Sequence, residues 1–372
     1  MHGSTVNVRI VREKGDQSMT LTINTNIPSM IAERNLNRAT NALNTSLERL
    51  TTGYKINHAA DNAAGYSIAD NWVTQIGSLD VASDNAATGA DLLTTAEQNY
   101  SILTGHLQRI RDLTVQAANG TYGSASLKAI QSEIYARLQE INRVSANTEF
   151  NGIKLMKYNT TDDTQNKGIG MTDKGVNLQV GLYNDNDSII NLDVNLFKSA
   201  QISSLFSGGE VTIYGKDSKG DTTKTVKTLD EVLQAAGGSV AALNTQDGLR
   251  AMAAACSALK YTPATTGEGT YTLLADEANN YGASAMIGFV DNAIDELSRR
   301  VTKIGAAQNR VTSAVESIDV QSQNLTSSLS TLRDTDVANE SSKYIQSQIL
   351  QQASATLLAT ANQSPSIALN LI

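Results

Sequence analysis

The chain has 372 residues, a formal net charge of −8 and only 5% aromatic residues. An acidic chain without a Lys/Arg cluster on any predicted helix face argues against nucleic acid as a partner. No apolar run approaches the roughly 18–20 residues that span a bilayer, so we expect no membrane insertion.

The first predicted helix begins near Pro28, which suits an opening turn that has no intrahelical hydrogen bond to lose. Residues 1–19 lack a helical period, and we interpret them as an extension or a mis-assigned start. An apolar stripe follows Pro28 and stops at Gly53, a residue typical of left-handed C-terminal caps. The stripe contains Leu36, Ala39, Leu43, Leu47 and Leu50.

A much longer helix is predicted over residues 79–117, where apolar residues recur in steps of three and four. This stripe contains Leu79, Ala82, Ala86, Ala90, Leu93, Ala96, Tyr100, Leu103, Leu107, Ile110, Thr114 and Ala117. At about 1.5 Å per residue the helix is a rod of roughly 60 Å, and a rod with a narrow apolar seam needs partner helices. After Asn119 and Gly120, a third helix is predicted to pack antiparallel against it. Its stripe is Leu127, Ile130, Ile134, Leu138 and Ile141.

The period changes near residue 150. Apolar residues alternate over 176–182 and again over 190–196, with an Asn/Asp turn between them, which predicts a β-hairpin. Residues 198–278 are rich in Gly, Ser, Thr and Asp, and we interpret them as a small α+β surface insert with a hairpin in 211–228 and a short helix near 250–259. Cys256, the single cysteine, excludes an intrachain disulfide, and its Ala-rich surroundings predict a buried residue rather than a reactive thiol.

A second long heptad stripe covers residues 290–332. It contains Val290, Ile294, Leu297, Val301, Ile304, Val311, Val315, Ile318, Ser322, Leu325, Leu329 and Leu332. Asp334 and Asp336 then suit the start of a new helix, because acidic groups stabilise its N-terminal end.

The predicted last helix extends to Pro365 and presents Ile345, Ile349, Ala353, Leu357 and Ala361 on one face. No charged side chain occurs from residue 344 to the end, although the segment is rich in Gln, Ser, Thr and Asn. It is too polar for lipid and carries too little charge for a solvated helix, so we expect burial among copies of the same chain. A disordered polar tail is the alternative.

The sequence resembles bacterial flagellin over about residues 20–197 and 279–372. The resemblance is specific because several ordered motifs occur at both ends of the chain. The motifs are Ile23–Asn26, Leu47–Asn57, Ala63–Gly65, Leu107–Leu113, Phe150–Gly152, Gly305–Arg310 and Gln348–Ala353.

The resemblance implies a mainly α structural subunit of the extracellular flagellar filament, exported unfolded by the flagellar type III apparatus. Its partners would be further copies of itself, an export chaperone, the filament cap and the hook–filament junction proteins. Residues 20–61 and 334–372 would be the inner-tube helices, 62–197 and 279–333 an elongated coiled-coil and helical-bundle rod domain, and 198–278 the outermost variable insert. Packing in the filament would use Leu36, Leu43, Leu47, Leu50, Ile345, Ile349 and Leu357.

The resemblance also implies recognition by the host's Toll-like receptor 5 through one face of the rod domain. The matching positions are Gln108, Arg109, Leu113, Gln116 and Glu133. An Arg beside an exposed Leu on a rigid helix suits an interface, because it combines a bidentate donor with an apolar contact. Without the resemblance, Arg109 would be interpreted as part of a solvated face, paired with Glu97, Asp112 or Glu133.

Catalytic functions have little support in the sequence. The three histidines, His2, His58 and His106, are far apart and form no zinc-binding pair, so we expect no enzyme activity, metal or cofactor. Two alternatives remain. One is the related hook–filament junction protein, and the other is a flagellin with an enzymatic insert at 198–278.

Overall fold

The structure is a computed structural model that describes residues 26–156, 171–172, 175–206, 210–216, 222–239, 242–243, 245–262, 270–273 and 276–369. The chain divides into two compact units, each described here by itself: unit 1 combines 1–73 with 326–372, and unit 2 spans 74–325. The predicted extension at 1–19 lies outside the described residues. Within the described chain, no helix has the length and apolar character needed to cross a membrane.

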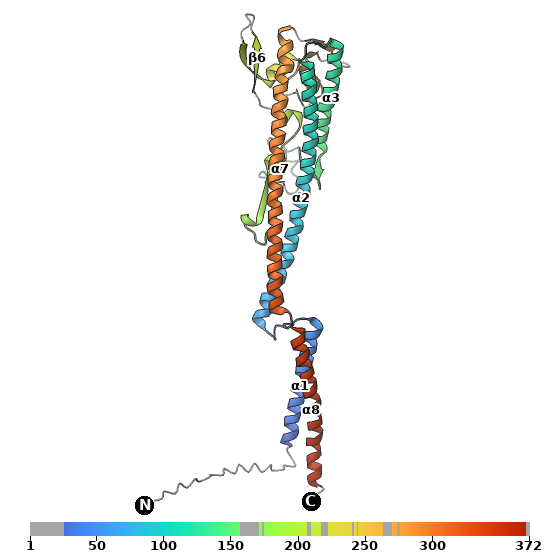
Figure 1. Ribbon diagram of the computed structural model, residues 1–372, viewed down its shortest axis with the longest axis vertical. Coiled ribbons are helices and arrows are strands. Elements are labelled where there is room, and N and C mark those ends of the chain that lie inside the picture. The colour runs from blue at the N-terminus through green and yellow to red at the C-terminus, as the bar shows by residue number, and fades with distance from the viewer. Residues whose placement is uncertain are drawn as a thin grey trace, which may run out of the picture. The chain divides into compact units, whose positions relative to one another are not determined.

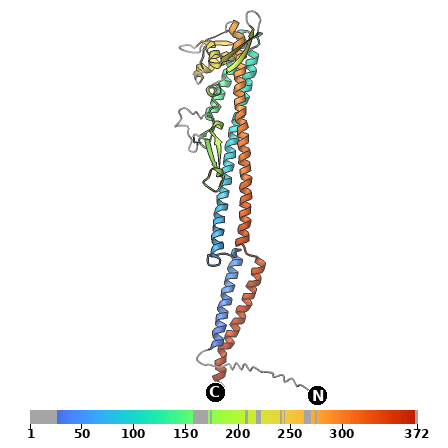
Figure 2. The same ribbon diagram turned by 90° about the vertical axis from the view of Figure 1, so that its left-hand side faces the viewer.

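Unit 1 is built on two helices, α1 (Ile27–Thr52) and α8 (Val337–Leu369), which lie side by side (Figures 1 and 2). They run antiparallel, since Asn26 contacts Ala361 at one end and Ser46 contacts Glu340 at the other. The predicted cap is confirmed: Gly53 is left-handed, with φ +76°, and its N–H donates to the Arg49 carbonyl.

The predicted end of the last helix at Pro365 is wrong, because α8 continues to Leu369. Proline inside a helix leaves the carbonyl four residues earlier without its donor. Here that carbonyl belongs to Ala361, and it accepts a hydrogen bond from the Asn26 side chain instead.

Unit 2 is a bundle of α3 (Ser124–Asn147) with the greater parts of two long helices that begin or end in unit 1. These are α2 (Ala63–Ala117), with 55 residues, and α7 (Asp276–Arg333), with 58 residues. The heptad stripes predicted for α2, α3 and α7 are confirmed, because within the described bundle their residues are buried or half-buried in one hydrophobic core. Polar pairs add to this packing: Gln308 of α7 donates to Glu97 of α2 at 2.8 Å.

The predicted β-hairpin is confirmed as β4 (Gly175–Gln179) paired antiparallel with β5 (Ile189–Asp193). Residues 194–196 differ from the prediction, because they form a short 3-10 helix rather than strand. The hairpin lies close to α2 at Gly89, where an added Cβ would be only 2.3 Å from the Leu178 Cδ1. Absence of a side chain at Gly89 therefore lets β4 dock on the bundle.

The described part of the 198–278 insert packs on the same bundle. Three short strands precede the insert: β1 (Glu149–Phe150), β2 (Ile153–Lys154) and β3 (Met171–Thr172). The described strands of the insert are β6 (Glu210–Lys216), β7 (Thr222–Thr228), β8 (Leu259–Thr262) and β9 (Thr270–Leu273). The short helices are α4 (Ile202–Leu205), α5 (Leu229–Ala235) and α6 (Gln246–Cys256). Thus the predicted insert hairpin and short helix are both confirmed, as β6–β7 and α6.

Helix α6 anchors the insert to the bundle. It packs against α3, and its buried residues Met252 to Cys256 belong to the core that α2, α3 and α7 share. Burial raises the pKa of the Cys256 thiol to about 12, which confirms the predicted buried and unreactive cysteine. The insert and the bundle therefore have one continuous core.

Candidate assembly and receptor surfaces

The contact between α1 and α8 follows a heptad pattern, but small residues occupy its centre. On α1 the buried positions are Ala32, Ala39 and Ser46, and the half-buried leucines of the predicted stripe are Leu36, Leu43 and Leu50. Small side chains at every seventh position let two helix backbones approach closely. The stripe predicted for α1 is thus confirmed apart from Leu47, which is 50% exposed.

On α8 the side facing α1 is polar, which the sequence did not suggest. Its buried positions are Glu340, Ser347 and Ser354, and the Gln351 amide donates to the Thr40 hydroxyl of α1 at 3.1 Å. The predicted apolar face does not make this contact: Ile345, Ile349 and Leu357 point away from α1 and are exposed. Hydrophobic periodicity failed here because the most buried positions of α8 carry hydroxyl and carboxylate groups, whereas Ile345, Ile349 and Leu357 are left outside.

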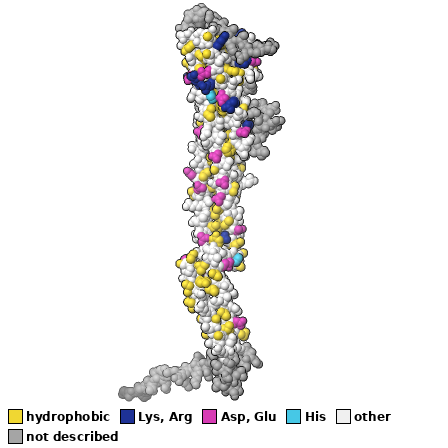
Figure 3. Space-filling view, turned by 90° about the vertical axis from the view of Figure 1, so that its right-hand side faces the viewer, with side chains coloured by type: hydrophobic (Ala, Val, Ile, Leu, Met, Phe, Trp, Pro, Cys, Tyr) yellow, Lys and Arg dark blue, Asp and Glu magenta, His cyan; other side chains and the backbone are white. Residues whose placement is uncertain are grey.

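Unit 1 consequently carries an unusual number of exposed apolar side chains. Exposed fractions reach 60% for Ile349 and 62% for Leu357. Figure 3 shows hydrophobic side chains gathered on the surface of the α1 and α8 part of the chain. The exposed members on these helices are Ile27, Met30, Ile31, Leu47, Val337, Ile345, Ile349, Leu350 and Leu357. Contiguous apolar surface of this kind marks an interaction site in a water-soluble protein.

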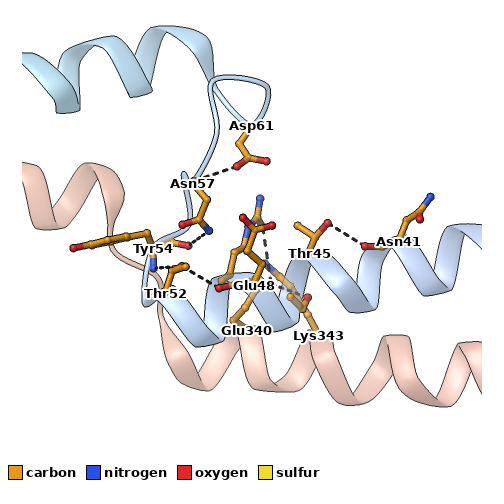
Figure 4. A network of polar contacts seen from close by, with 11 residues as sticks. Asn41, Thr45, Glu48, Thr52, Tyr54, Asn57, Asp61, Glu340 and Lys343 are labelled. Carbon is orange, nitrogen blue, oxygen red and sulfur yellow. Dashed lines mark hydrogen bonds and ion pairs between the residues drawn. The ribbon is translucent and has the colours of Figure 1, made fainter.

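The contact between α1 and α8, called the seam below, includes one buried charge, the carboxylate of Glu340 (Figure 4). Ser46 donates to it at 2.8 Å, Lys343 donates at 3.2 Å, and Arg49 lies 3.9 Å away. Burial alone would raise the pKa of Glu340, but the hydrogen bonds from Ser46 and Lys343 together with the two cations lower it. Glu340 is therefore ionised and held in place at neutral pH.

Next to Glu340, the two segments that link the long helices pair with each other inside unit 1. Backbone hydrogen bonds join Lys55 to Arg333 at 2.7 Å and Thr335 to Gly53 at 2.9 Å. The Arg333 guanidinium lies 4.2 Å from the centroid of the Tyr54 ring, a favourable cation–π geometry. Asp61 closes the first linker by accepting from the backbone of Asn57 and His58 (Figure 4).

Three of the five residues in the predicted receptor site, Gln108, Arg109 and Gln116, are exposed on α2 of unit 2, and Glu133 of α3 is half-buried beside them. Arg109 donates from its Nε to the Glu133 Oε1 at 2.9 Å, which confirms one of the pairings expected for a solvated face. Gln116 donates to the Tyr122 hydroxyl, and Gln108 is exposed. Figure 3 shows acidic and basic side chains gathered in this part of the surface.

Leu113 does not fit the predicted exposed apolar contact, because it is only 2% exposed. Helix α2 is covered by α3 and the insert as well as by α7, so its buried stripe is wider than a two-helix seam. Leu113 lies on that wider stripe and belongs to the core. The expectation that it is exposed next to Arg109 is wrong.

The residues considered for catalysis are scattered. His58 contacts Glu48 at 2.8 Å in unit 1, and His106 lies 3.3 Å from an Arg137 nitrogen in unit 2. The described residues contain no group of three or more His, Cys, Asp or Glu that could hold a metal ion. A cleft of about 450 Å³ is present in unit 1, and three of the four carboxylates that line it, Asp61, Asp336 and Glu340, are engaged in the linker, helix-cap and seam contacts.

Comparison with known proteins supplies the family. The chain matches two family models, the bacterial flagellin N-terminal helical region over residues 23–161 and the bacterial flagellin C-terminal helical region over residues 287–372. Flagellin D of Vibrio anguillarum and Flagellin D of Vibrio cholerae are each 33% identical, over 95% of this chain and 100% of their own length. A solved structure, a putative flagellar hook-associated protein from Vibrio parahaemolyticus, covers 74% of this chain and 100% of that chain at 14% identity and a TM-score of 0.43. That TM-score is too low to support a shared function, so the family assignment rests on the sequence comparisons.

Proposed function

This chain belongs to the bacterial flagellin family, whose members are structural subunits of the extracellular flagellar filament, and we propose that its α1/α8 pair is the surface through which it polymerises. The observation that carries the proposal is the exposed apolar surface of α1 and α8. A pair that buries small and polar residues while leaving Ile349 and Leu357 in water gains little hydrophobic free energy by itself. Contact with further copies supplies the missing burial.

The proposal extends to how the chain is organised and delivered. Residues 20–61 and 334–372 form the inner tube, 62–197 and 279–333 the rod, and 198–278 the outermost part. The chain is exported unfolded by the flagellar type III apparatus, bound before export by a chaperone, and assembled beneath the filament cap on the hook–filament junction proteins. The finished filament serves swimming motility.

The same relatives bear on the two alternatives. The full-length relatives are named flagellins, which supports a filament subunit over a hook–filament junction protein. They are structural proteins, and we propose that this chain is likewise not an enzyme, including its 198–278 insert.

The test of the assembly surface is a charge placed in the apolar surface. Ile349→Glu should raise the critical concentration for polymerisation by about tenfold or more, because the new carboxylate would be buried without a partner. Gln348→Glu is the matched control, since it adds the same charge at a neighbouring exposed polar position of α8. Electron microscopy and sedimentation after seeding with filament fragments measure both. Equal polymerisation of Ile349→Glu and wild type would contradict the proposal.

The proposed receptor surface comprises Gln108, Arg109, Gln116 and Glu133, with Leu113 supporting it from beneath. Arg109 suits an interface anchor because its side chain is 48% exposed while the helix that carries it is fixed by the core. Arg109→Ala should lower signalling potency in Toll-like receptor 5 reporter cells by about tenfold. Arg299→Ala, an exposed arginine of α7, is the control, and unchanged potency for Arg109→Ala would remove Arg109 from the interface.

A further inference from the structure

The repeated small residues of the α1/α8 seam do not define its register. Its buried small residues repeat every seven positions, as Ala32 and Ala39 on α1 and as Ser347 and Ser354 on α8. A slide of one helix past the other by seven residues would place similar side chains opposite each other. Contacts that occur once must therefore select the register, and the described seam has them at its two ends as well as in the Gln351–Thr40 hydrogen bond between them.

One such contact forms where α8 passes through Pro365. In an α-helix the N–H of residue 365 would donate to the carbonyl of residue 361, but proline carries no N–H. The Asn26 Nδ2 donates to the Ala361 carbonyl at 2.8 Å and occupies the place of the missing donor. An unmet carbonyl inside a helix pair would otherwise cost free energy.

The same amide group also holds the beginning of α1. Its Oδ1 accepts from the Ser29 backbone N–H at 3.1 Å, which makes Asn26 the N-cap of α1. The orientation of the amide is fixed by chemistry, since the Ser29 N–H can only donate and the Ala361 carbonyl can only accept. Beside it, the Ser29 hydroxyl donates to the Asn362 Oδ1 at 2.7 Å.

We propose that Asn26 is a positioning residue that sets the register of α1 against α8 by pairing with the carbonyl that Pro365 leaves open. Sliding α8 by seven residues would bring the Ser354 carbonyl to Asn26, and the N–H of Leu358 already serves that carbonyl in a regular helix. The slide would also leave Ala361 without a donor. Asn26 therefore distinguishes one register from its neighbours, which the repeated Ala and Ser positions do not.

The inference rests on the proposed assembly function, because register decides which outer side chains form one surface. Ile27, Met30 and Ile31 of α1 and Leu357 of α8 lie near the Asn26 end, and their relative positions change if either helix slides. A neighbouring copy that packs on this surface meets a single arrangement only if the register is fixed. Asn26 thus contributes to filament assembly through α8, without itself needing to touch the neighbouring copy.

The test is a double-mutant cycle on the full chain, read as the critical concentration for seeded polymerisation. Asn26→Asp keeps the N-cap acceptor and removes the donor to Ala361, so the critical concentration should rise by about two- to tenfold. Pro365→Ala restores the helix's own N–H donor at that position, and alone it should polymerise close to wild type. The double variant should recover most of the loss.

The matched control is Asn41→Asp, the same change at an exposed position of α1, and it should leave the critical concentration unchanged. The inference is overturned if Asn26→Asp equals Asn41→Asp, if the two changes at 26 and 365 are simply additive, or if Pro365→Ala alone polymerises worse than Asn26→Asp. Wild type and Ile349→Glu, assayed alongside, report separately on the assembly surface itself. If Ile349→Glu raises the critical concentration relative to wild type but positions 26 and 365 show no coupling, the register role of Asn26 is overturned and the assembly surface is not.

Discussion

The two units of the chain bury opposite kinds of side chain. In the bundle of unit 2, large apolar residues such as Leu107 and Ile134 are fully buried, and ion pairs such as Arg109–Glu133 lie on its surface. In unit 1 the fully buried residues of the contact between α1 and α8 are alanine, serine and one glutamate, while Ile345, Ile349 and Leu357 remain exposed. The bundle therefore holds its fold within one chain, whereas in the proposed assembly the α1/α8 pair gains further hydrophobic stabilisation when other copies cover it.

The largest expected effect follows from this contrast in burial. Leu107→Ala should lower the free energy of unfolding of unit 2 by about 2–5 kcal/mol, because it removes buried methyl groups and leaves a cavity. Leu357→Ala makes the same change at an exposed position of unit 1 and should alter monomer stability by less than about 0.5 kcal/mol. Chemical denaturation of unpolymerised protein, followed by circular dichroism, measures both.

Leu357→Ala, which should have the smaller effect on monomer stability, should have a clear effect on polymerisation. Leu357→Ala should raise the critical concentration, because the side chain becomes buried only on assembly. If Leu357→Ala instead destabilised the monomer as much as Leu107→Ala, the distinction between a self-sufficient bundle and a dependent helix pair would be lost.

A smaller effect is expected from Arg300, a buried cation of unit 2. Arg300 is 3% exposed and donates to the carbonyls of Lys198 and Ser199, which fastens the start of the insert to α7. Arg300→Met should cost about 2–4 kcal/mol, since both buried carbonyls lose a charged donor. Arg299→Met, at the neighbouring exposed position, should change stability by less than about 0.5 kcal/mol. Thermal unfolding of both variants compares them, and similar midpoints would show that the Arg300 contacts are not needed.

The elements that could be predicted from the sequence are those whose apolar stripes are buried against other parts of the same chain. The stripes of α2, α3 and α7 follow apolar periodicity because their partners lie in the same chain and their burial is hydrophobic. The side of α8 that faces α1 was not predicted, because Ser347, Gln351 and Ser354 provide no hydrophobic signal. Its apolar side was predicted, and Ile345, Ile349 and Leu357 of that side are left exposed by the residues that the structure describes.

The other departures have the same origin in contacts that sequence periodicity does not report. Leu113 was expected at the surface because one heptad seam does not reveal that three elements cover α2. Pro365 was expected to end α8 because the compensating donor, Asn26, lies more than 300 residues away in sequence. One signal for Glu340 was present in the sequence, because it is one of few charged residues in α8 and follows the Asp336 cap.

A pH-dependent effect is expected in unit 1 because of Glu340. Hydrogen bonds and nearby cations hold the pKa of this carboxyl lower in the folded chain than its unfolded value of about 4.3. A carboxyl shifted in this direction contributes stability above the unfolded pKa, and the contribution is lost as the pH falls through the folded pKa. Filaments should therefore dissociate on acidification partly because Glu340 becomes protonated.

Glu340→Gln isolates this contribution. The variant should polymerise less well than wild type at neutral pH, and the difference should shrink as the pH falls below about 4. Glu33→Gln, at an exposed position of α1, should show no such difference. Light scattering during acid titration of assembled filaments follows both variants, and a constant gap between Glu340→Gln and wild type at every pH would contradict the role of ionised Glu340.

The smallest effect is expected at the surface of unit 2, where Arg109 and Glu133 form an exposed ion pair. Glu133→Gln should leave the midpoint of thermal unfolding unchanged, because water and salt screen charges at such positions and the side chains lose little by separating. Calorimetry at low and high salt measures this directly. An unchanged midpoint means that loss of signalling in Arg109→Ala reflects a lost receptor contact rather than a weakened bundle. A marked fall in the midpoint would instead make the pair part of the fold, and the receptor assay would then need the Glu133→Gln protein as its reference.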